Sequence, residues 1–113
     1  MANKYVMNVD QGSTWNVQAT IKTDGVAWDL TGYTARMKVR PSVESSTVTM
    51  SITDTDGITL GGAAGTVTLS RSATQTAAIT AGSYVYDLEL VSGGGVVTRI
   101  LQGPFVVSAE VTR

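Results

Sequence analysis

The sequence of 113 residues contains no cysteine and no histidine. Without cysteine the chain can form no disulfide and no zinc–thiolate site, and it has no thiolate nucleophile. Without histidine it lacks the commonest general base and the commonest transition-metal ligand. Because most familiar catalytic constellations need one of these side chains, we expect a protein that is not an enzyme and that holds neither a cofactor nor a metal ion.

Charged residues are also few. They make up 15% of the sequence, with 8 basic against 9 acidic side chains and a net charge of −1. This balance provides no basic field for a phosphate backbone, so nucleic acid is not an expected partner. No apolar run approaches the roughly 18 residues of a membrane helix, and the amino-terminal residues lack the apolar stretch of a secretory signal. We therefore expect no membrane partner and synthesis in a cytoplasm.

The sequence does contain a strong period of two. Apolar and polar residues alternate in four segments, at residues 15–21, 33–40, 84–90 and 105–111. This alternation is typical of strands with one buried face. Shorter strand candidates lie at residues 5–9, 48–52, 58–60, 66–69 and 96–101. Since turn residues separate these segments and the length suits one domain, the sequence predicts a single all-β domain over residues 1–113, an antiparallel sandwich of about seven to nine strands.

Glycine and proline mark the connections between these strands. The Asp-Gly pairs at residues 24–25 and 56–57 supply the positive φ that tight hairpin turns need. Three glycines at residues 93–95 predict a longer hairpin loop. Pro41 is expected to end the strand before it, because proline has no N–H to donate to a central ladder.

One segment departs from the strand pattern. Ser72 and Gln75 have the spacing of a capping box, and alanines follow them. We predict one short helical turn near residues 72–80 that crosses from one sheet to the other. Tyr84 comes directly after this turn, in the position of the tyrosine that closes a corner of immunoglobulin-like sandwiches.

Two glycine-containing loops invite a chemical interpretation. Asp54 and Asp56 precede a turn glycine as in a calcium loop, but Ile52 stands where an earlier ligand is needed and the late glutamate is missing, so an ordinary turn is expected. The glycine-rich residues 61–65 could cradle a phosphate, but such a loop opens a helix and here a strand pattern follows. A flexible connection is the expected structure of this segment.

Charged side chains on the predicted strand faces form another candidate site. Asp87 and Glu89 lie on one face and could act as the carboxylate pair of a glycosidase. Arg36, Lys38 and Arg40 also share one face, which favours cross-strand ion pairing and a charged surface between strands or subunits.

The two tryptophans are expected to have different places. Trp15 is in register with apolar residues and is expected in the core, whereas Trp28 lies in a connection, and tryptophan is frequent in interface hot spots. The expected interface residues are Trp28, Arg36, Lys38, Arg40 and Arg99.

Several short motifs, taken in order, resemble those of a family of small tailed-bacteriophage proteins. The motifs are DQGSTW at 10–15, DLTGYTARMKVR at 29–40, GITL at 57–60, GTVTL at 65–69, GSYVYDLEL at 82–90 and VTR at 111–113. In order and spacing the chain is similar to immunoglobulin-like virion proteins related to the amino-terminal domain of phage baseplate upper proteins.

The resemblance implies an immunoglobulin-like sandwich with a structural role in a virion, as a tail, baseplate, neck or fibre-attachment component. It implies tail, fibre, portal-neck or capsid proteins as partners, a homo-oligomer in a symmetric assembly, and synthesis in the host bacterial cytoplasm. It carries over no catalytic residue. The alternatives are a capsid decoration (cement) protein and a small carbohydrate-binding or adhesin module centred on Trp28 and Tyr33.

Overall fold

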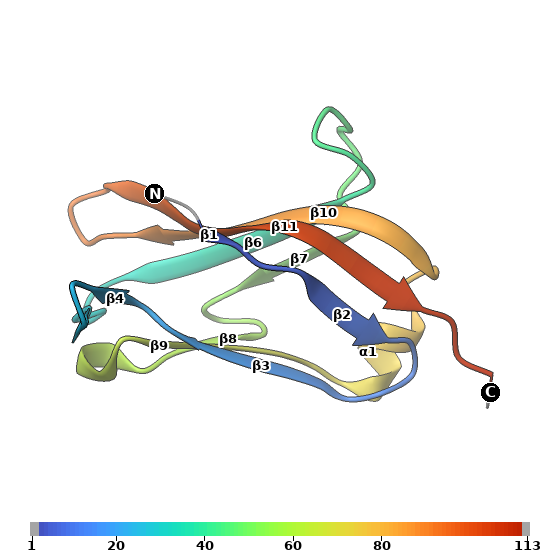
Figure 1. The fold of residues 1–113 in the computed structure, drawn as a ribbon, viewed down its shortest axis with the longest axis horizontal. Coiled ribbons are helices and arrows are strands. Elements are labelled where there is room, and N and C mark those ends of the chain that lie inside the picture. The colour runs from blue at the N-terminus through green and yellow to red at the C-terminus, as the bar shows by residue number, and fades with distance from the viewer. Residues whose placement is uncertain (1–2, 112–113) are drawn as a thin grey trace.

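The computed structural model describes residues 3–111, which form eleven strands, one short α-helix and one 3₁₀ turn (Figure 1). The elements in chain order are β1 (Asn3–Lys4), β2 (Met7–Asp10), β3 (Trp15–Thr20), β4 (Lys22–Thr23), β5 (Val26–Ala27), β6 (Thr34–Arg40), β7 (Met50–Thr53), β8 (Ile58–Leu60), the 3₁₀ turn (Gly62–Ala64), β9 (Thr66–Arg71), α1 (Ala73–Ala77), β10 (Gly82–Val91) and β11 (Val97–Ser108). Of the strands, β1, β4 and β5 have two residues each, and the other eight agree with the seven to nine expected.

The strands form two facing layers (Figure 1). The larger sheet has the order β1-β11-β10-β6-β7, and β2 also pairs with β11. The smaller sheet has the order β3-β9-β8, while β4 and β5 form a hairpin of their own. In immunoglobulin sandwiches strands C, F and G share one sheet and strands B, E and D the other. Since β6, β10 and β11 correspond to C, F and G, and β3, β9 and β8 to B, E and D, the predicted immunoglobulin-like β-sandwich is confirmed.

The pairing of the first and last strands differs from the prediction. Both β1 and β2 run parallel to β11, so the sandwich is not wholly antiparallel. The two strands expected at 96–101 and 105–111 are one continuous strand, β11, which ends at Ser108. Beyond that end Val111 is 91% exposed, and the apolar alternation there does not mark a buried face.

Gly103 and Pro104 lie where β11 changes its partner. β1 pairs with β11 as far as Gln102, and β2 resumes the pairing at Phe105. The two residues between them have no partner on that edge, so a proline there removes no ladder hydrogen bond on that side. Gly103 has a φ of 147°, and a Cβ atom on it would lie 2.8 Å from the carbonyl oxygen of Tyr5. Only glycine fits this close approach of two backbones.

The two Asp-Gly pairs make different turns. Residues 24–25 join β4 to β5 with φ of 53° at Asp24 and 78° at Gly25, so the tight hairpin predicted there is confirmed. The hairpin predicted at residues 56–57 is wrong, because β7 pairs with β6 and β8 pairs with β9. The turn instead crosses between the sheets, since an Asp-Gly pair specifies a backbone conformation and not which strands pair.

A buried arginine holds this crossing. Arg71 is 7% exposed, and its Nη1 lies 3.0 Å from Asp56 Oδ1. Its Nη2 donates to the carbonyl oxygen of Asp56 at 3.1 Å. One guanidinium therefore fixes both the side chain and the backbone of the turn.

The predicted helical turn is present as α1, which connects β9 in the smaller sheet to β10 in the larger one. The Ser72 N–H donates to Gln75 Oε1 at 2.9 Å, and the Gln75 N–H donates to Ser72 Oγ at 3.2 Å. This reciprocal pair is the predicted capping box. The Tyr84 hydroxyl donates to the carbonyl oxygen of Thr80 at 2.5 Å, as a corner tyrosine does.

The glycine-rich connection at residues 61–65 is an ordered turn and not the flexible segment expected. The Leu30 N–H donates to the carbonyl of Gly62 at 2.9 Å, and the Ile21 N–H donates to the carbonyl of Gly65 at 2.8 Å. A Cβ atom on Gly65, whose φ is 70°, would lie 2.9 Å from the carbonyl oxygens of Ile21 and Trp28. These contacts hold the turn against residues 21–30.

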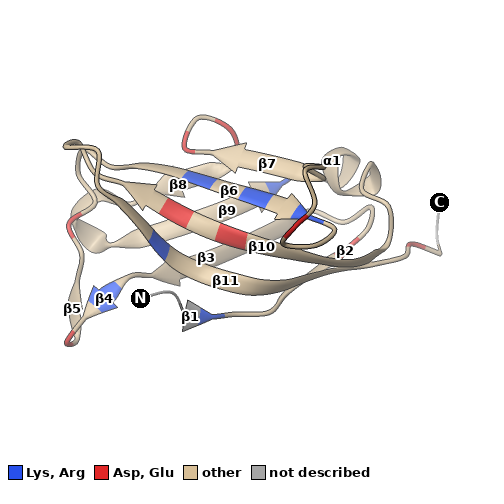
Figure 2. Cartoon of the chain, turned by 90° about the horizontal axis from the view of Figure 1, so that it is seen from above, with Lys and Arg blue, Asp and Glu red and all other residues tan. Residues whose placement is uncertain are grey.

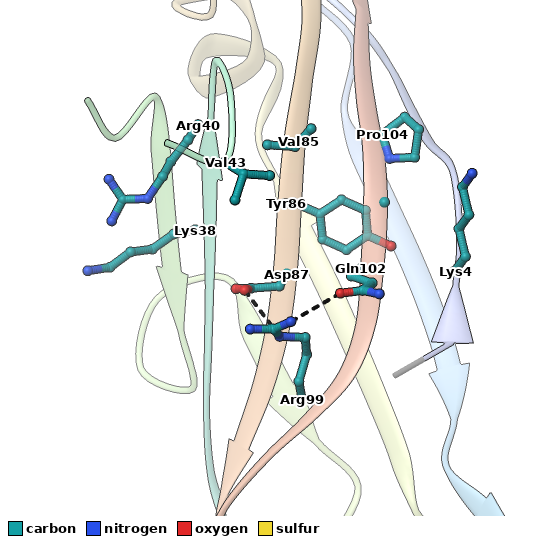
Figure 3. A pocket seen from close by; sticks show the side chains of 11 residues that line it. Lys4, Lys38, Arg40, Val43, Val85, Tyr86, Asp87, Arg99, Gln102 and Pro104 are labelled. Carbon is teal, nitrogen blue, oxygen red and sulfur yellow. Dashed lines mark hydrogen bonds and ion pairs between the residues drawn. The ribbon is translucent and has the colours of Figure 1, made fainter. Parts of the chain in front are cut away.

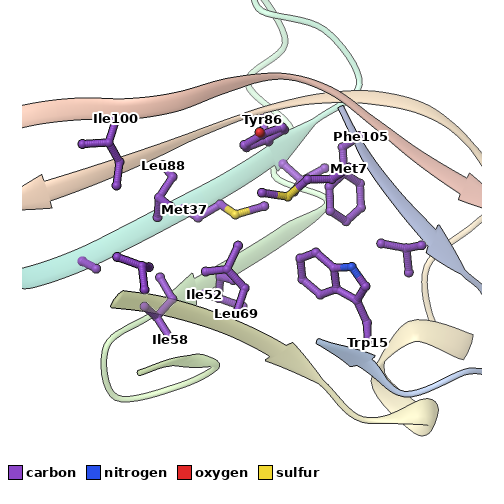
Figure 4. Close-up of a cluster of buried hydrophobic side chains, with 14 of the residues drawn as sticks. Met7, Trp15, Met37, Ile52, Ile58, Leu69, Tyr86, Leu88, Ile100 and Phe105 are labelled. Atoms are coloured by element: carbon purple, nitrogen blue, oxygen red, sulfur yellow. The ribbon is translucent and has the colours of Figure 1, made fainter. Parts of the chain in front are cut away.

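The core lies between the two sheets and is built around three aromatic rings (Figure 4). Trp15 on β3 meets the ring of Phe105 on β11 edge-on, with ring centroids 5.7 Å apart and an interplanar angle of 82°. Tyr86 on β10 approaches the same ring with centroids 6.4 Å apart. The core position expected for Trp15 is confirmed, since its exposed fraction is 6%. Packing of this kind is the main stabilising contribution in a chain without disulfides.

Tyr86 brings a polar group into this core. Its hydroxyl donates to the carbonyl oxygen of Tyr5 at 2.7 Å, and the residue is 4% exposed. Burial raises the pKa of the Tyr86 phenol above its ordinary value. The bond ties β10 to the link between β1 and β2.

We expect Tyr86→Phe to lower the free energy of unfolding by about 1 kcal/mol near neutral pH, because the Tyr5 carbonyl loses its donor. The pKa of Tyr86 is raised in the folded protein, so the unfolded chain releases this proton first once the pH exceeds about 10. The folded protein with Tyr86 therefore loses stability above that pH, and the variant loses less. Urea unfolding of both proteins at neutral and alkaline pH measures the difference. If the two proteins differed in the free energy of unfolding by the same amount at neutral and at alkaline pH, the role given to the buried phenol would be contradicted.

We also expect Gly103→Ala to destabilise the fold by about 1–3 kcal/mol, because the new methyl group would collide with the Tyr5 carbonyl at an unfavourable φ. Gly94→Ala is the matched control. Its Cβ atom would find only Ser92 Oγ at 3.9 Å, and its φ lies outside the left-handed region. Thermal unfolding of the two variants should separate them clearly. Equal melting temperatures would show that β11 can shift away from Tyr5.

Candidate interaction surface

The outer face of the larger sheet carries charged side chains from three neighbouring strands. The alternation of β6 places Ala35, Met37 and Val39 in the core. It therefore places Arg36, Lys38 and Arg40 on the opposite, outer face, as predicted. Figure 2 shows these basic residues beside the acidic residues of β10, with one basic residue of β11 on the far side.

Ion pairs connect these strands. Arg36 Nε lies 2.8 Å from Glu89 Oε1, and the two residues are directly opposite in the β6–β10 ladder. This is the predicted cross-strand ion pair. Asp87 is opposite Lys38 in the ladder, but its carboxylate lies 3.4 Å from Arg99 Nε on β11. Each carboxylate of the suggested glycosidase pair is therefore engaged by an arginine.

Arg99 is also bound on its other side. Its Nη1 donates to Gln102 Oε1 at 3.2 Å (Figure 3). A register shift in the β10–β11 ladder, between Leu88 and Glu89, brings Arg99 and Gln102 to the same face although they are three positions apart. The bulge thus places the guanidinium above Asp87.

A groove of about 550 Å³ lies on this face (Figure 3). Its basic lining residues are Lys4, Lys38, Arg40 and Arg99. Its one acidic lining residue is Asp87, and the other lining residues are Val43, Val85, Tyr86, Gln102, Gly103 and Pro104. The structure therefore brings three of the predicted interface residues into one groove. Arg36 lies beside them on the same face.

The segment between β6 and β7 forms a wall of this groove. β6 ends at Arg40 before Pro41, as predicted, and Arg40 Nη1 donates to the carbonyl oxygen of Ser45 at 3.2 Å. Val43 lines the groove and is 81% exposed. β7 follows this segment and pairs with β6 alone among the strands of residues 3–111. Its other edge is partly covered, since the Ser51 carbonyl accepts from Arg71 Nη2 and Thr53 exchanges backbone hydrogen bonds with Asp56.

Trp28 lies apart from the charged face. It packs against the core, its backbone N–H donates to the carbonyl of Ile21 at 2.9 Å, and its indole N–H donates to Thr23 Oγ1. It lines a smaller hollow of about 390 Å³, together with residues 19–23 and with Thr98, Ile100 and Leu101. The structure thus separates Trp28 from the other predicted interface residues, and it ties the polar edge of the indole to the β4–β5 hairpin.

The aspartates near Trp28 and in the crossing turn have structural partners. Hydrogen bonds from the side chain and backbone of Thr31 lower the pKa of the Asp29 carboxyl. Asp54 Oδ1 accepts the Ala35 N–H at 3.3 Å, and Asp56 binds Arg71. Over residues 3–111 no group of three or more metal-ligating side chains is found. The two aspartates of the turn therefore serve the connection between the sheets.

Sequence reasoning missed three residues of the groove, Lys4, Val43 and Gln102. Lys4 reaches the groove because β1 pairs with β11, with Lys4 opposite Gln102. A pairing between residues almost a hundred positions apart has no local sequence signal. The single clue available in the sequence is the placement of lysine next to a short apolar segment at residues 5–9.

Comparisons with known proteins find a likeness among solved structures alone. No family model and no curated protein matches the chain. Among solved structures, the chain is similar to the extracellular domain of the voltage-gated sodium channel beta4 subunit, whose parallel homodimers are described as explaining a role in cell–cell adhesion. The match covers 98% of this chain and 96% of that chain, with 13% sequence identity and a TM-score of 0.39. At these values the likeness carries no argument about function or partners.

In the part of the chain that the structure describes, no helix has the length and apolar character needed to span a bilayer.

We expect Lys38→Gln to change the free energy of unfolding by less than about 0.5 kcal/mol, because an exposed charge contributes little to stability. Arg40→Gln should cost more, about 0.5–1.5 kcal/mol, because the half-buried Arg40 also loses its hydrogen bond to the Ser45 carbonyl. Phe105→Ala, which empties a fully buried position, should cost about 3–5 kcal/mol and serves as the contrast. Urea unfolding measures all three. A loss above about 1 kcal/mol for Lys38→Gln would mean that the charge serves folding and not a partner.

Proposed function

We propose that the protein is a non-enzymatic structural component of a tailed-bacteriophage particle that acts through protein–protein assembly. The proposed place is the tail, baseplate, neck or fibre attachment, as the motif order of the sequence implies. The observation that carries the proposal is the charged outer face of the larger sheet. There, ion-paired and unpaired basic groups line one open groove.

Such a face suits recognition of a protein surface. The ion pairs of Arg36 and Arg99 fix two guanidinium groups in position before a partner arrives. Arginine is enriched in protein interfaces, and complementary charges fix the register and the choice of partner more than they raise affinity. An interface held in this way is specific without a large apolar patch.

Exposed apolar side chains in the segment before β7 support the proposed homo-oligomer. A symmetric assembly uses the same interface in every copy, so even a small apolar contact is made many times. Val43 and Val48, 81% and 40% exposed, lie just before β7. They would provide apolar contact in an interface formed by this segment.

The alternative of a capsid decoration protein uses the same surfaces and differs in location and copy number. The alternative of a carbohydrate-binding module rests on Trp28 and has less support. The indole N–H is already bonded to Thr23, and the ring packs against the core. We therefore place assembly before glycan binding.

The test uses purified bacteriophage particles from a bacterial strain that encodes the chain. We expect mass spectrometry to detect the protein in the particles and cryo-electron microscopy to place it at the tail, baseplate or neck. A double change, Lys38→Glu with Arg40→Glu, should reduce its amount in the particles severalfold, because like charges would then face the partner.

The matched control is Lys22→Glu, a single charge reversal away from the groove, compared with the single change Lys38→Glu, which alters the net charge by the same amount. This control should be incorporated normally. Density over the capsid lattice would favour the decoration protein. Absence of the chain from the particles would disprove the proposal.

A further inference from the structure

The groove on the outer face has an excess of positive charge. Four basic side chains line it against one carboxylate, Asp87, and that carboxylate is already paired with Arg99. Lys4 and Lys38 form no ion pair with any residue in the described part of the chain, and Arg40 binds only a carbonyl oxygen. Three positive charges in the groove are therefore left without a counter-charge.

The register of four strands places two of these charges, those of Lys38 and Lys4, at the ends of one cross-strand row. Lys38, Asp87, Gln102 and Lys4 are successive cross-strand neighbours on β6, β10, β11 and β1. Neighbouring strands are about 4.8 Å apart, so the backbones at Lys38 and Lys4 are separated by about 14 Å. Figure 3 shows the two lysines on opposite sides of the groove, with Asp87 and Gln102 between them.

We propose that this groove binds an extended peptide segment of a partner protein that carries two carboxylates about four residues apart. An extended chain advances about 3.4 Å per residue, so four residues span the 14 Å or so between the lysines. Side chains four positions apart in an extended segment point the same way, and both carboxylates can then face the sheet.

The residues in the middle of the groove determine which residues the middle of the bound peptide can have. Asp87 and Gln102 lie there, and Arg99 holds the Gln102 oxygen, which leaves the amide N–H₂ group turned away from that bond. Backbone N–H groups of a peptide can donate to Asp87, and a backbone carbonyl can accept from the Gln102 amide. Val43, Val85 and Pro104 provide apolar contact at the side of the row. The central residues of the segment are therefore uncharged.

This arrangement fits a peptide better than a nucleic acid. A phosphate chain presents negative charge at every nucleotide and would bring one phosphate over Asp87. The net charge of the whole chain is −1, so no extended basic field surrounds the groove. A peptide can place its two acidic residues over the lysines and a neutral residue over Asp87.

The inference rests on the proposed function in one respect, since it makes the partner a neighbouring protein of the particle. It is tested on the isolated full-length chain, whereas the proposed function is tested on particles. Either can therefore fail while the other stands.

The probe is an acetylated, amidated peptide with two glutamates separated by three uncharged residues and a neutral fluorescent label. Fluorescence anisotropy at low ionic strength measures its Kd. We expect Lys38→Gln and Lys4→Gln each to weaken binding about threefold, and the double variant about tenfold. Salt near 1 M, where the Debye length is about 3 Å, should abolish it. Amide chemical shifts should change on β6, β10 and β11 when the peptide is added.

Three controls accompany these measurements: one protein variant with the same loss of charge, and two peptides of the same length as the probe. Lys22→Gln removes a lysine outside the groove and should leave the Kd unchanged. A peptide with glutamines in place of the glutamates should not bind, and one with the two glutamates adjacent should bind about threefold more weakly.

Failure of the first peptide to bind, or equal weakening by Lys22→Gln, would overturn the site. Equal binding of the adjacent-glutamate peptide would overturn the spacing. Tighter binding of an oligothymidylate of similar length would overturn the assignment to a peptide. The small exposed substitutions keep the core intact, and the melting temperature of each variant confirms that it is folded.

Discussion

The contact of Phe105 with Trp15 on one side and Tyr86 on the other is the interaction on which the sandwich depends. Trp15 belongs to the smaller sheet, whereas the other two rings belong to the larger one. No disulfide can join the two layers, because the chain has no cysteine. The close packing of side chains between the sheets therefore sets how the sheets lie against each other, and interiors of this density tolerate few alternative arrangements.

That core also determines the outer surface. Along β6, and along β10 from Tyr86 to Leu90, inward apolar residues alternate with outward charged ones, so the burial of Met37 and Leu88 fixes the directions of Lys38 and Asp87. A slip by one residue would move every charge into the core. The positions of the charges on the groove are thus determined by residues that never touch a partner, while the charged residues themselves are left free to serve recognition.

Local patterns predicted local structure well. The alternation predicted β6 and β10, and the Ser72–Gln75 spacing predicted the capped helix. The position of Tyr84 predicted the corner tyrosine. The basic row on β6 and its pair with Glu89 also follow from period and charge. What the sequence could not predict is long-range pairing: the parallel docking of β1 and β2 on β11 brings Lys4 to the groove, and the turn at residues 56–57 joins two sheets. Both depend on packing across the whole chain and have no signal within a few residues.

The parallel pairing of β2 with β11 also has a mechanical meaning. The two strands lie side by side and point the same way, with Met7–Asp10 opposite Phe105–Ser108 (Figure 1). A force that pulls the chain before β1 against the chain after β11 acts along these strands, so it slides one past the other. Their hydrogen bonds are then loaded together and not one after another. Rupture under tension is governed by the unfolding barrier and not by equilibrium stability. A domain without a single covalent cross-link thus gains resistance to shear along its 42 Å axis.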